Sequence, residues 1–343
     1  MDRPGRKGKR RSRALAVLLG LVLAFLAGEI ILRVHGVYAP PGAGLKAGRP
    51  IWIRTNPPGS LVPYRSEEFC YYSRASSLGL RNREVPQKPP GEFRIVALGD
   101  SFTEGMGTPA NRTWPRTLER LLRQDTAAGF SVVNAGICGD DPFYAFVLLR
   151  DRLAALSPDL VLLAQNATDV TDAVRRGGME RFSPDGTVVY PNAGPARRLL
   201  LSSAWACFYL EVFRHYHWLY LTPEVFEARM ERLFTVQVPD LVDRYRNLSQ
   251  KDGFSFAVIF QPMRYEVISG GYCRDSRLYL DALKGTGVPV VDLLPFFLEN
   301  GAQEDLDAWF WSEDGHLKPE GYEAMAGAVR RELAARGLLP AGS

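Results

Sequence analysis

A serine lies where an apolar, strand-like run meets a glycine-rich turn, in the stretch RIVALGDSFTEGMG. The run ends at Gly99, the chain turns through Asp100 and Ser101, and a helical stretch follows. A Ser at such a junction projects from the strand end beside backbone N–H groups, which can stabilise an alkoxide and a later oxyanion. The sequence therefore predicts nucleophilic catalysis by Ser101. The structural alternative is a helix N-cap serine.

A histidine with acidic neighbours lies late in the chain, in WFWSEDGHLKPEGY. A general base needs an imidazole held in one tautomer by a carboxylate. Asp314 and Glu313 can both supply that carboxylate to His316. The other three histidines adjoin the apolar N-terminal run or lie in an aromatic-rich segment: His35, His215 and His217.

These blocks resemble the SGNH (GDSL-like) hydrolase family, in its membrane-anchored bacterial form, over roughly residues 78 to 335. The resemblance rests on GLRNREVPQKPPGEFRIVALGDSFTEG, VVNAGICGDDPFYA and PDLVLLAQNATDVTD. It implies a Ser101 nucleophile and hydrolysis or transfer of an ester acyl group. DGH is similar to the family's late block in its D-x-H form, which favours Asp314 as the histidine's partner. A strict D-x-x-H spacing would select Glu313 instead.

The resemblance also implies an oxyanion hole. The backbone N–H groups of Ser101 and Gly136 are the expected donors, because Gly136 matches the family's glycine block. The family's third donor is the Asn of G-x-N-D, but this chain has Asn166, Ala167, Thr168 and Asp169. Either the Thr168 hydroxyl donates, or Asn166 reaches in from the glycine position. Asp169 is expected to stabilise the loop.

Five short apolar runs alternate with amphipathic helical stretches, which predicts a mostly parallel sheet covered on both faces. We expect an α/β fold with three layers, α/β/α, of the SGNH or flavodoxin-like kind. Ligands then bind beyond the carboxyl ends of the strands, where the candidate residues lie. The runs are RIVAL (94–98), FSVVNAG (130–136), DLVLLAQ (159–165), FAVIFQP (256–262) and VPVVDL (288–293).

The N-terminus combines a basic block with an apolar run. Residues 1–13 hold seven Lys or Arg against one Asp, a charge of +6, so the remainder of the +4 chain carries about −2. This pattern argues against nucleic-acid binding. Residues 14–34 are long enough to cross a bilayer as a helix. They have no good A-x-A cleavage site, which favours an uncleaved signal anchor over a cleaved signal peptide.

We expect a basic cytoplasmic tail (1–13), a transmembrane anchor (14–34), a stalk leading into the domain (35–91) and a hydrolase domain (92–338). The last contains an aromatic-rich insertion at 181–240, read either as a lid or membrane-facing surface or as an ordinary packed helical segment. The domain would then lie outside the inner or plasma membrane, in the periplasm or outside the cell.

Four widely spaced cysteines show no C-x-x-C pair, which disfavours a zinc site. One or two disulfides, or buried unpaired thiols, are both consistent with their spacing. No metal or nucleotide signature is present, so no cofactor is expected. The cysteines are Cys70, Cys138, Cys207 and Cys273.

The expected activity is that of a serine esterase acting on ester-linked acyl groups, with O-acetyl groups of cell-envelope glycans as one substrate class. One alternative is an O-acyltransferase of envelope polysaccharide. Another is a glycan-binding or assembly protein with weak catalysis. Thr168 in place of the family's Asn supports this alternative, because the loss of one oxyanion donor costs roughly 100- to 1,000-fold in rate.

Overall fold

The computed structural model describes residues 5–34, 55–125, 129–182, 202–206, 208 and 223–340. Contacts between Cα atoms divide the chain into two compact units. One comprises Met1–Pro50 and Arg175–Val225, and the other comprises Ile51–Val174 and Phe226–Ser343.

The second unit is built on a five-stranded parallel sheet with strand order β4-β3-β5-β6-β7. Each strand coincides with one of the five apolar runs, so that prediction is confirmed. Ile95 to Leu98 in the central strand β3 are fully buried, as expected for a strand covered on both faces. The strands are β3 (Phe93–Gly99), β4 (Phe130–Gly136), β5 (Leu160–Gln165), β6 (Ser255–Phe260) and β7 (Val290–Asp292).

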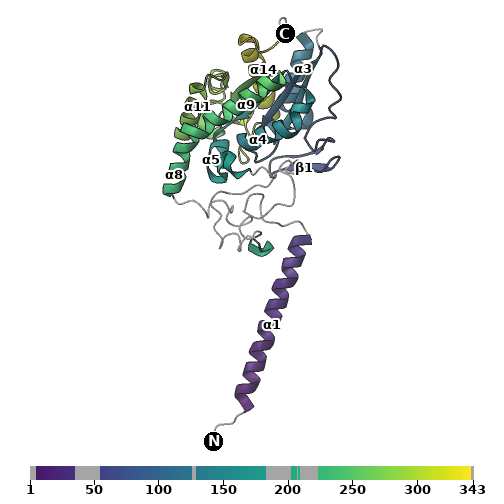
Figure 1. Ribbon diagram of the computed structural model, residues 1–343, viewed down its shortest axis with the longest axis vertical. Helices are drawn as coiled ribbons and strands as arrows, with labels where there is room; N and C mark the ends of the chain where they lie inside the picture. The colour runs from purple at the N-terminus through teal and green to yellow at the C-terminus, as the bar shows by residue number, and fades with distance from the viewer. Residues whose placement is uncertain are drawn as a thin grey trace. The chain divides into compact units, whose positions relative to one another are not determined.

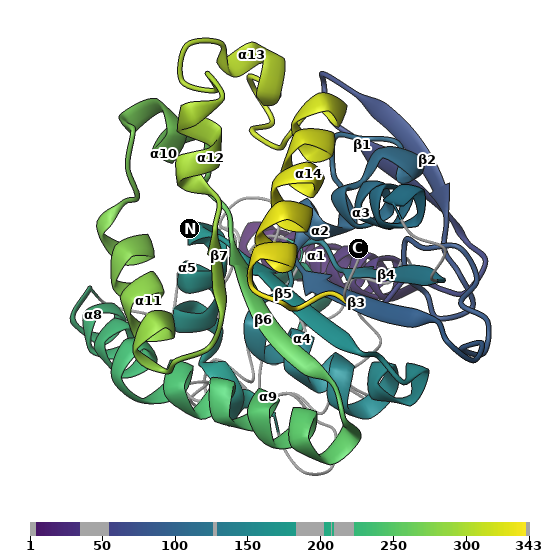
Figure 2. The same cartoon turned by 90° about the horizontal axis from the view of Figure 1, so that it is seen from above.

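Helices cover both faces of this sheet. Figure 2 shows α3 and α14 on one face and α4 and α9 on the other, which confirms the predicted three layers. The helices that follow β3 are α2 (Ser101–Glu104), α3 (Trp114–Asp125), α4 (Pro142–Leu148), α5 (Ala167–Arg176), α8 (Pro223–Arg232) and α9 (Val238–Asp252). Those near the C-terminus are α10 (Arg264–Ser269), α11 (Arg274–Gly285), α12 (Leu294–Glu299), α13 (Leu306–Trp309) and α14 (Pro319–Ala335).

Aromatic side chains fill the space between the layers. Tyr245 on α9 is fully buried and stacks on Phe256 of β6, with ring centroids 4.2 Å apart. Phe146 of α4 meets the same tyrosine edge-on at 5.1 Å. Large rings that pack in these arrangements bury much apolar area and fix the helices against the sheet.

A two-stranded antiparallel hairpin precedes the main sheet. It comprises β1 (Leu61–Arg65) and β2 (Cys70–Arg74), with Tyr64 opposite Tyr71. The hairpin lies in the segment that the sequence assigned to a stalk at 35–91, whose first part falls outside the described residues. The described part folds in the same compact unit as the sheet.

The other unit contains α1 (Gly5–Val34), drawn in purple in Figure 1. Its segment Arg13–Val34 is long and apolar enough to cross a membrane, with a mean hydropathy of 2.7 and none of it buried. The same unit holds residues 202–206 and 208 of the predicted aromatic insertion. Most of the remaining insertion up to α8 lies outside the described residues.

The described cysteines form no disulfide with one another. Cys70 and Cys138 are exposed and Cys273 is partly exposed, so the expectation of buried thiols is wrong for the first two. Cys207 lies outside the described residues.

Candidate active site

Ser101 is the first residue of α2, directly beyond the carboxyl end of β3. Asp100 caps this helix, because its carboxylate accepts the Phe102 N–H at 3.0 Å. Gly99 has a φ of 150°, and a Cβ there would lie 2.8 Å from the Ala164 carbonyl oxygen, so the tight turn requires glycine. N–H groups in the first turn of a helix have no acceptor within the helix, which leaves that of Ser101 available to an oxyanion.

The structure brings together three residues that the sequence singled out. Ser101 Oγ lies 2.7 Å from His316 Nε2, and His316 Nδ1 lies 2.5 Å from Asp314 Oδ1. If Nδ1–H donates to the carboxylate, Nε2 is free to accept the serine proton. Phe102 packs against the imidazole with ring centroids 4.5 Å apart, which restricts its orientation.

The two candidate partners of His316 occupy different places. Asp314 contacts the imidazole, while Glu313 has an exposed side chain and its backbone N–H donates to Glu68. The geometry therefore corresponds to the D-x-H spacing.

Gly136 is not placed as an oxyanion donor, which corrects the sequence-based expectation. It ends β4, and its N–H donates to Asn134 Oδ1 at 3.1 Å. A Cβ at this position would lie 2.1 Å from the backbone nitrogen of Glu104. Glycine is needed here for close packing of β4 against α2. The loop that continues the strand contains Gly139, whose φ of 66° also favours glycine.

Asn166 is also turned away from the role that the sequence left open for it. Its side chain is fully buried, and its Nδ2 donates to Asp100 Oδ2 at 2.9 Å. Its Oδ1 accepts both the N–H of Thr168, at 2.8 Å, and the Thr168 hydroxyl, at 2.7 Å. Thr168 is exposed, so its hydroxyl is the accessible one of the two candidate groups, and it can donate to an oxyanion once it leaves Asn166 Oδ1.

Two buried carboxyls support this loop. Asp169 Oδ2 accepts the Asn166 N–H at 2.8 Å. Burial raises the pKa of Asp169 well above its ordinary value, and the charge of Asp100 adds to the shift. Burial also raises the pKa of Asp100, while hydrogen bonds from Asn166 and Phe102 oppose that change. Asp169 therefore serves the loop, as the sequence predicted.

Sequence reasoning missed a buried polar cluster beneath α2. Glu104 accepts the Tyr64 hydroxyl at 2.6 Å and the Cys138 N–H at 2.5 Å, and burial raises the pKa of its carboxyl. Arg81 lies over the Tyr64 ring, 3.7 Å from its centroid, and donates to the Thr108 carbonyl at 2.6 Å. The sequence gives only a weak signal for this cluster, because Glu104 is a charged residue in the GDSFTEG stretch whose partners are far away in sequence.

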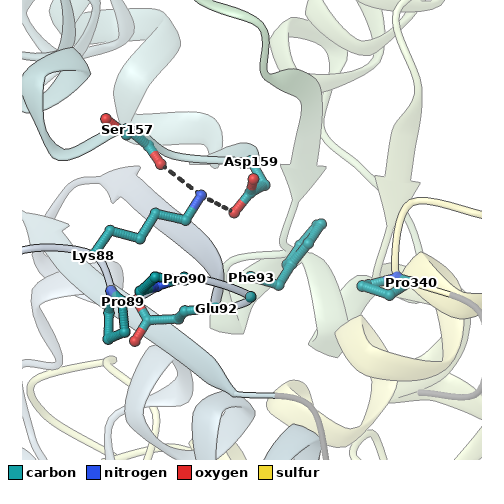
Figure 3. A pocket seen from close by; sticks show the side chains of 9 residues that line it. Lys88, Pro89, Pro90, Glu92, Phe93, Ser157, Asp159 and Pro340 are labelled. Atoms are coloured by element: carbon teal, nitrogen blue, oxygen red, sulfur yellow. Dashed lines mark hydrogen bonds and ion pairs between the residues drawn. The ribbon is translucent and has the colours of Figure 1, made fainter.

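A surface pocket near Lys88 is separate from these residues. It is lined by residues at the amino ends of β3 and β5, such as Phe93 and Asp159, opposite the strand ends that carry Ser101. Figure 3 shows Lys88 bonded to Asp159 and to the Ser157 carbonyl. The distances are 2.5 and 3.0 Å, so the Lys88 ammonium and the Asp159 carboxylate already have partners. Among the described residues, no group of three His, Cys, Asp or Glu side chains could hold a metal ion.

Part of the chain matches a family profile and a known protein. The sequence profile of the GDSL-like Lipase/Acylhydrolase family matches residues 97–324. An arylesterase of Vibrio mimicus is 32% identical over 76 residues, which are 22% of this chain and 38% of that protein. The aligned segment thus spans well under half of that relative.

Solved structures that resemble this chain include a lipase/acylhydrolase from Enterococcus faecalis, with 15% identity, a TM-score of 0.43 and coverage of 71% of this chain and 96% of that one. A two-domain esterase active on acetylated mannans has 14% identity, a TM-score of 0.43 and coverage of 71% and 50%. The profile match covers most of the chain and includes Ser101 and His316. The chain therefore belongs to the GDSL-like lipase/acylhydrolase family.

Proposed function

We propose that this protein is a serine esterase that cleaves carboxylic esters through an acyl-enzyme on Ser101. The observation that carries the proposal is the chain of short contacts from Ser101 Oγ to His316 Nε2 and from His316 Nδ1 to Asp314. Such an arrangement activates a hydroxyl that is otherwise a weak nucleophile.

In the first step, Ser101 Oγ attacks the ester carbonyl carbon while its proton passes to His316 Nε2. The carbonyl oxygen becomes an oxyanion, held by the Ser101 N–H and by the Thr168 hydroxyl, which turns to it from Asn166 Oδ1. The C–O bond to the alcohol then breaks, and His316 returns the proton to the leaving oxygen.

In the second step, His316 takes a proton from water, whose oxygen attacks the acyl-enzyme. The bond to Ser101 breaks, Oγ recovers the proton, and a carboxylic acid leaves. The Asp314 carboxylate stabilises the imidazolium through its contact with His316 Nδ1.

The activity is tested with the full chain in detergent on aryl esters of acetate and longer acids. Wild-type protein is expected to hydrolyse at least one of them and Ser101→Ala none, while Ser269→Ala on the remote α10 retains full activity. A fluorophosphonate probe should label wild-type protein at Ser101. Equal inactivity of wild type and Ser101→Ala, without labelling, would instead support the non-catalytic binding protein.

We further propose that α1 anchors the chain in a cell membrane and places the catalytic unit on the extracytoplasmic side. The support is the 22-residue apolar segment Arg13–Val34 directly after the basic tail. Acylated glycans of the cell envelope are the substrates within reach of an enzyme so placed. Alkaline extraction of cell membranes should leave the full-length chain in the pellet. A soluble chain shortened at its N-terminus would contradict the anchor.

A further inference from the structure

The turn of the β1–β2 hairpin holds the loop that carries the acid and the histidine. Glu68 lies in this turn, and its carboxylate accepts four hydrogen bonds from the loop. The donors are Ser312 N at 2.9 Å, Ser312 Oγ at 2.8 Å, Glu313 N at 3.0 Å and Asp314 N at 2.8 Å. The last donor belongs to the residue whose side chain contacts His316.

A ring contact strengthens the same junction. Phe69, next to Glu68, is 6% exposed and packs on Trp311 with ring centroids 5.5 Å apart. Trp311 Nε1 in turn donates to the Gly107 carbonyl at 2.9 Å, in the loop that follows α2. The hairpin turn therefore contacts the histidine loop directly and the serine loop through Trp311.

We propose that Glu68 is a positioning residue, which fixes the backbone of residues 312–314 so that Asp314 holds His316 in line with Ser101. This inference rests on the proposed esterase activity. Hydrogen bonds between a carboxylate and several N–H groups are strong and directional. Although desolvation acts in the opposite direction, the bonds from Asp314, Ser312 and Glu313 lower the pKa of Glu68, so the group is ionised at neutral pH.

The test compares Glu68→Gln with Glu67→Gln in the full chain. Glutamine presents an NH₂ group to backbone donors, so the loop must shift, and a displacement of about 1 Å at reacting groups can cost roughly 100-fold in rate. We expect Glu68→Gln to lower both kcat and the rate of fluorophosphonate labelling roughly ten- to a hundredfold with KM nearly unchanged. Glu67 is exposed, and its variant should match wild type.

A second variant separates positioning from folding. Glu68→Asp keeps the carboxylate, so at an equal melting temperature it should label faster than Glu68→Gln. A role in folding alone would lower the melting temperature without slowing labelling of the protein that remains folded. Wild-type labelling rates in both variants would overturn the positioning role, whereas absence of labelling in wild type would overturn the esterase proposal with it.

A separate set of contacts concerns α1 and the described part of the aromatic segment. Glu29 of α1 accepts hydrogen bonds from Ser203 Oγ at 3.0 Å, Ala204 N at 2.8 Å and Trp205 N at 3.2 Å. Arg33 donates to the Ser202 carbonyl at 2.5 Å. The two charged residues that interrupt the end of the apolar run thus have partners in residues 202–205.

Trp205 lies against the same helix. Its Nε1 donates to the Phe25 carbonyl at 3.0 Å, and the two rings stack with centroids 6.4 Å apart. A Cβ at Gly28 would lie 2.2 Å from the indole, so glycine makes room for it. Trp205 nevertheless remains 38% exposed, beside the exposed apolar side chains of α1.

We infer that residues 202–206 dock on α1 in the outer leaflet of a phospholipid bilayer and that the Trp205 ring, which contacts Phe25 and Gly28 inside the apolar segment, faces the acyl chains. The inference rests on the proposed membrane anchor. The Trp205 N–H donates to the Phe25 carbonyl, so its polar group has a partner and the apolar ring can lie among acyl chains. A cleaved signal peptide would have no need of a docking site for a distant part of the chain.

The full chain is placed in phosphatidylcholine vesicles whose acyl chains carry bromine near the middle of their length. The emission of Trp205 is obtained as the difference between wild type and Trp205→Phe. We expect bromine to quench it by at least half. Gly28→Val should reduce that quenching, whereas Gly20→Val should not, because no atom lies within 4 Å of a Cβ at Gly20.

The outcomes separate the two ideas. If the chain floats with the vesicles but the Trp205 emission is not quenched, or if Gly28→Val leaves quenching unchanged, the docking inference fails and the anchor stands. If the chain does not float with the vesicles, the anchor and the docking both fail, and the esterase proposal is unaffected.

Discussion

Asn166 donates its side-chain amide to Asp100 at 2.9 Å, and both residues are buried directly beyond the ends of the adjacent strands β5 and β3. The asparagine is thereby committed to the loop structure. Its carbonyl oxygen holds Thr168, which is exposed beside the nucleophile's helix cap. Asn166 therefore supports the loop, while Thr168 is the one that can face a substrate, and separate predictions follow for the two residues.

Thr168→Val should lower kcat roughly 100-fold with little change in KM, because it removes one oxyanion donor and keeps the side-chain shape. Steady-state kinetics on an aryl ester measure the effect. Thr171→Val, the same change about one turn further along α5, serves as the control and should keep kcat within a factor of two. Unchanged kcat in Thr168→Val would exclude its hydroxyl from the oxyanion hole.

Asn166→Ala should lower the free energy of unfolding by about 1–3 kcal/mol, because the buried Asp100 carboxyl loses a hydrogen-bond donor. Urea denaturation measures the difference. Asn247→Ala on the exposed side of α9 should change stability by less than about 0.5 kcal/mol. Equal midpoints for the two variants would contradict the structural role of Asn166.

Asp314→Asn should lower kcat roughly 10³- to 10⁴-fold, because a neutral amide no longer holds the imidazole in the required tautomer. Glu313→Gln removes the neighbouring charge without touching the imidazole and should leave kcat nearly unchanged. Turnover of the two variants on one ester decides between the D-x-H and D-x-x-H spacings. The reverse pattern would assign the role to Glu313.

Asp169→Asn should change how stability depends on pH. The raised pKa of Asp169 means that its neutral form stabilises the fold at low pH, and that this stabilisation declines as the pH rises above the ordinary value of 3.8 and through the raised pKa. The variant carries a permanently neutral group. Relative to wild type, it should gain stability as the pH rises from about 4 to 8, measured by urea unfolding at each pH. A constant difference would show that Asp169 has no raised pKa.

The parallel sheet and its polar edge could be predicted from the sequence. Continuous apolar runs such as RIVAL and DLVLLAQ form strands that are buried on both faces, and parallel strands place their carboxyl ends at one edge. That rule brings Ser101 and the Asn166 loop together before any side-chain position is known. The late acid–histidine block was recognisable because Asp314 and His316 are close in sequence, so their contact is largely local.

Only the tertiary structure decided which partner each polar group at the strand ends contacts. Gly136 and Asn166 are at plausible positions for oxyanion donors, but Gly136 packs closely against Glu104 of α2, and Asp100 accepts the amide of Asn166. Glu68 contacts a loop more than 240 residues further along the chain, so no local pattern could reveal it. The sequence by itself determined which groups lie at the strand ends. Packing between distant segments decided which of those groups face a substrate, because each buried polar atom must find a partner.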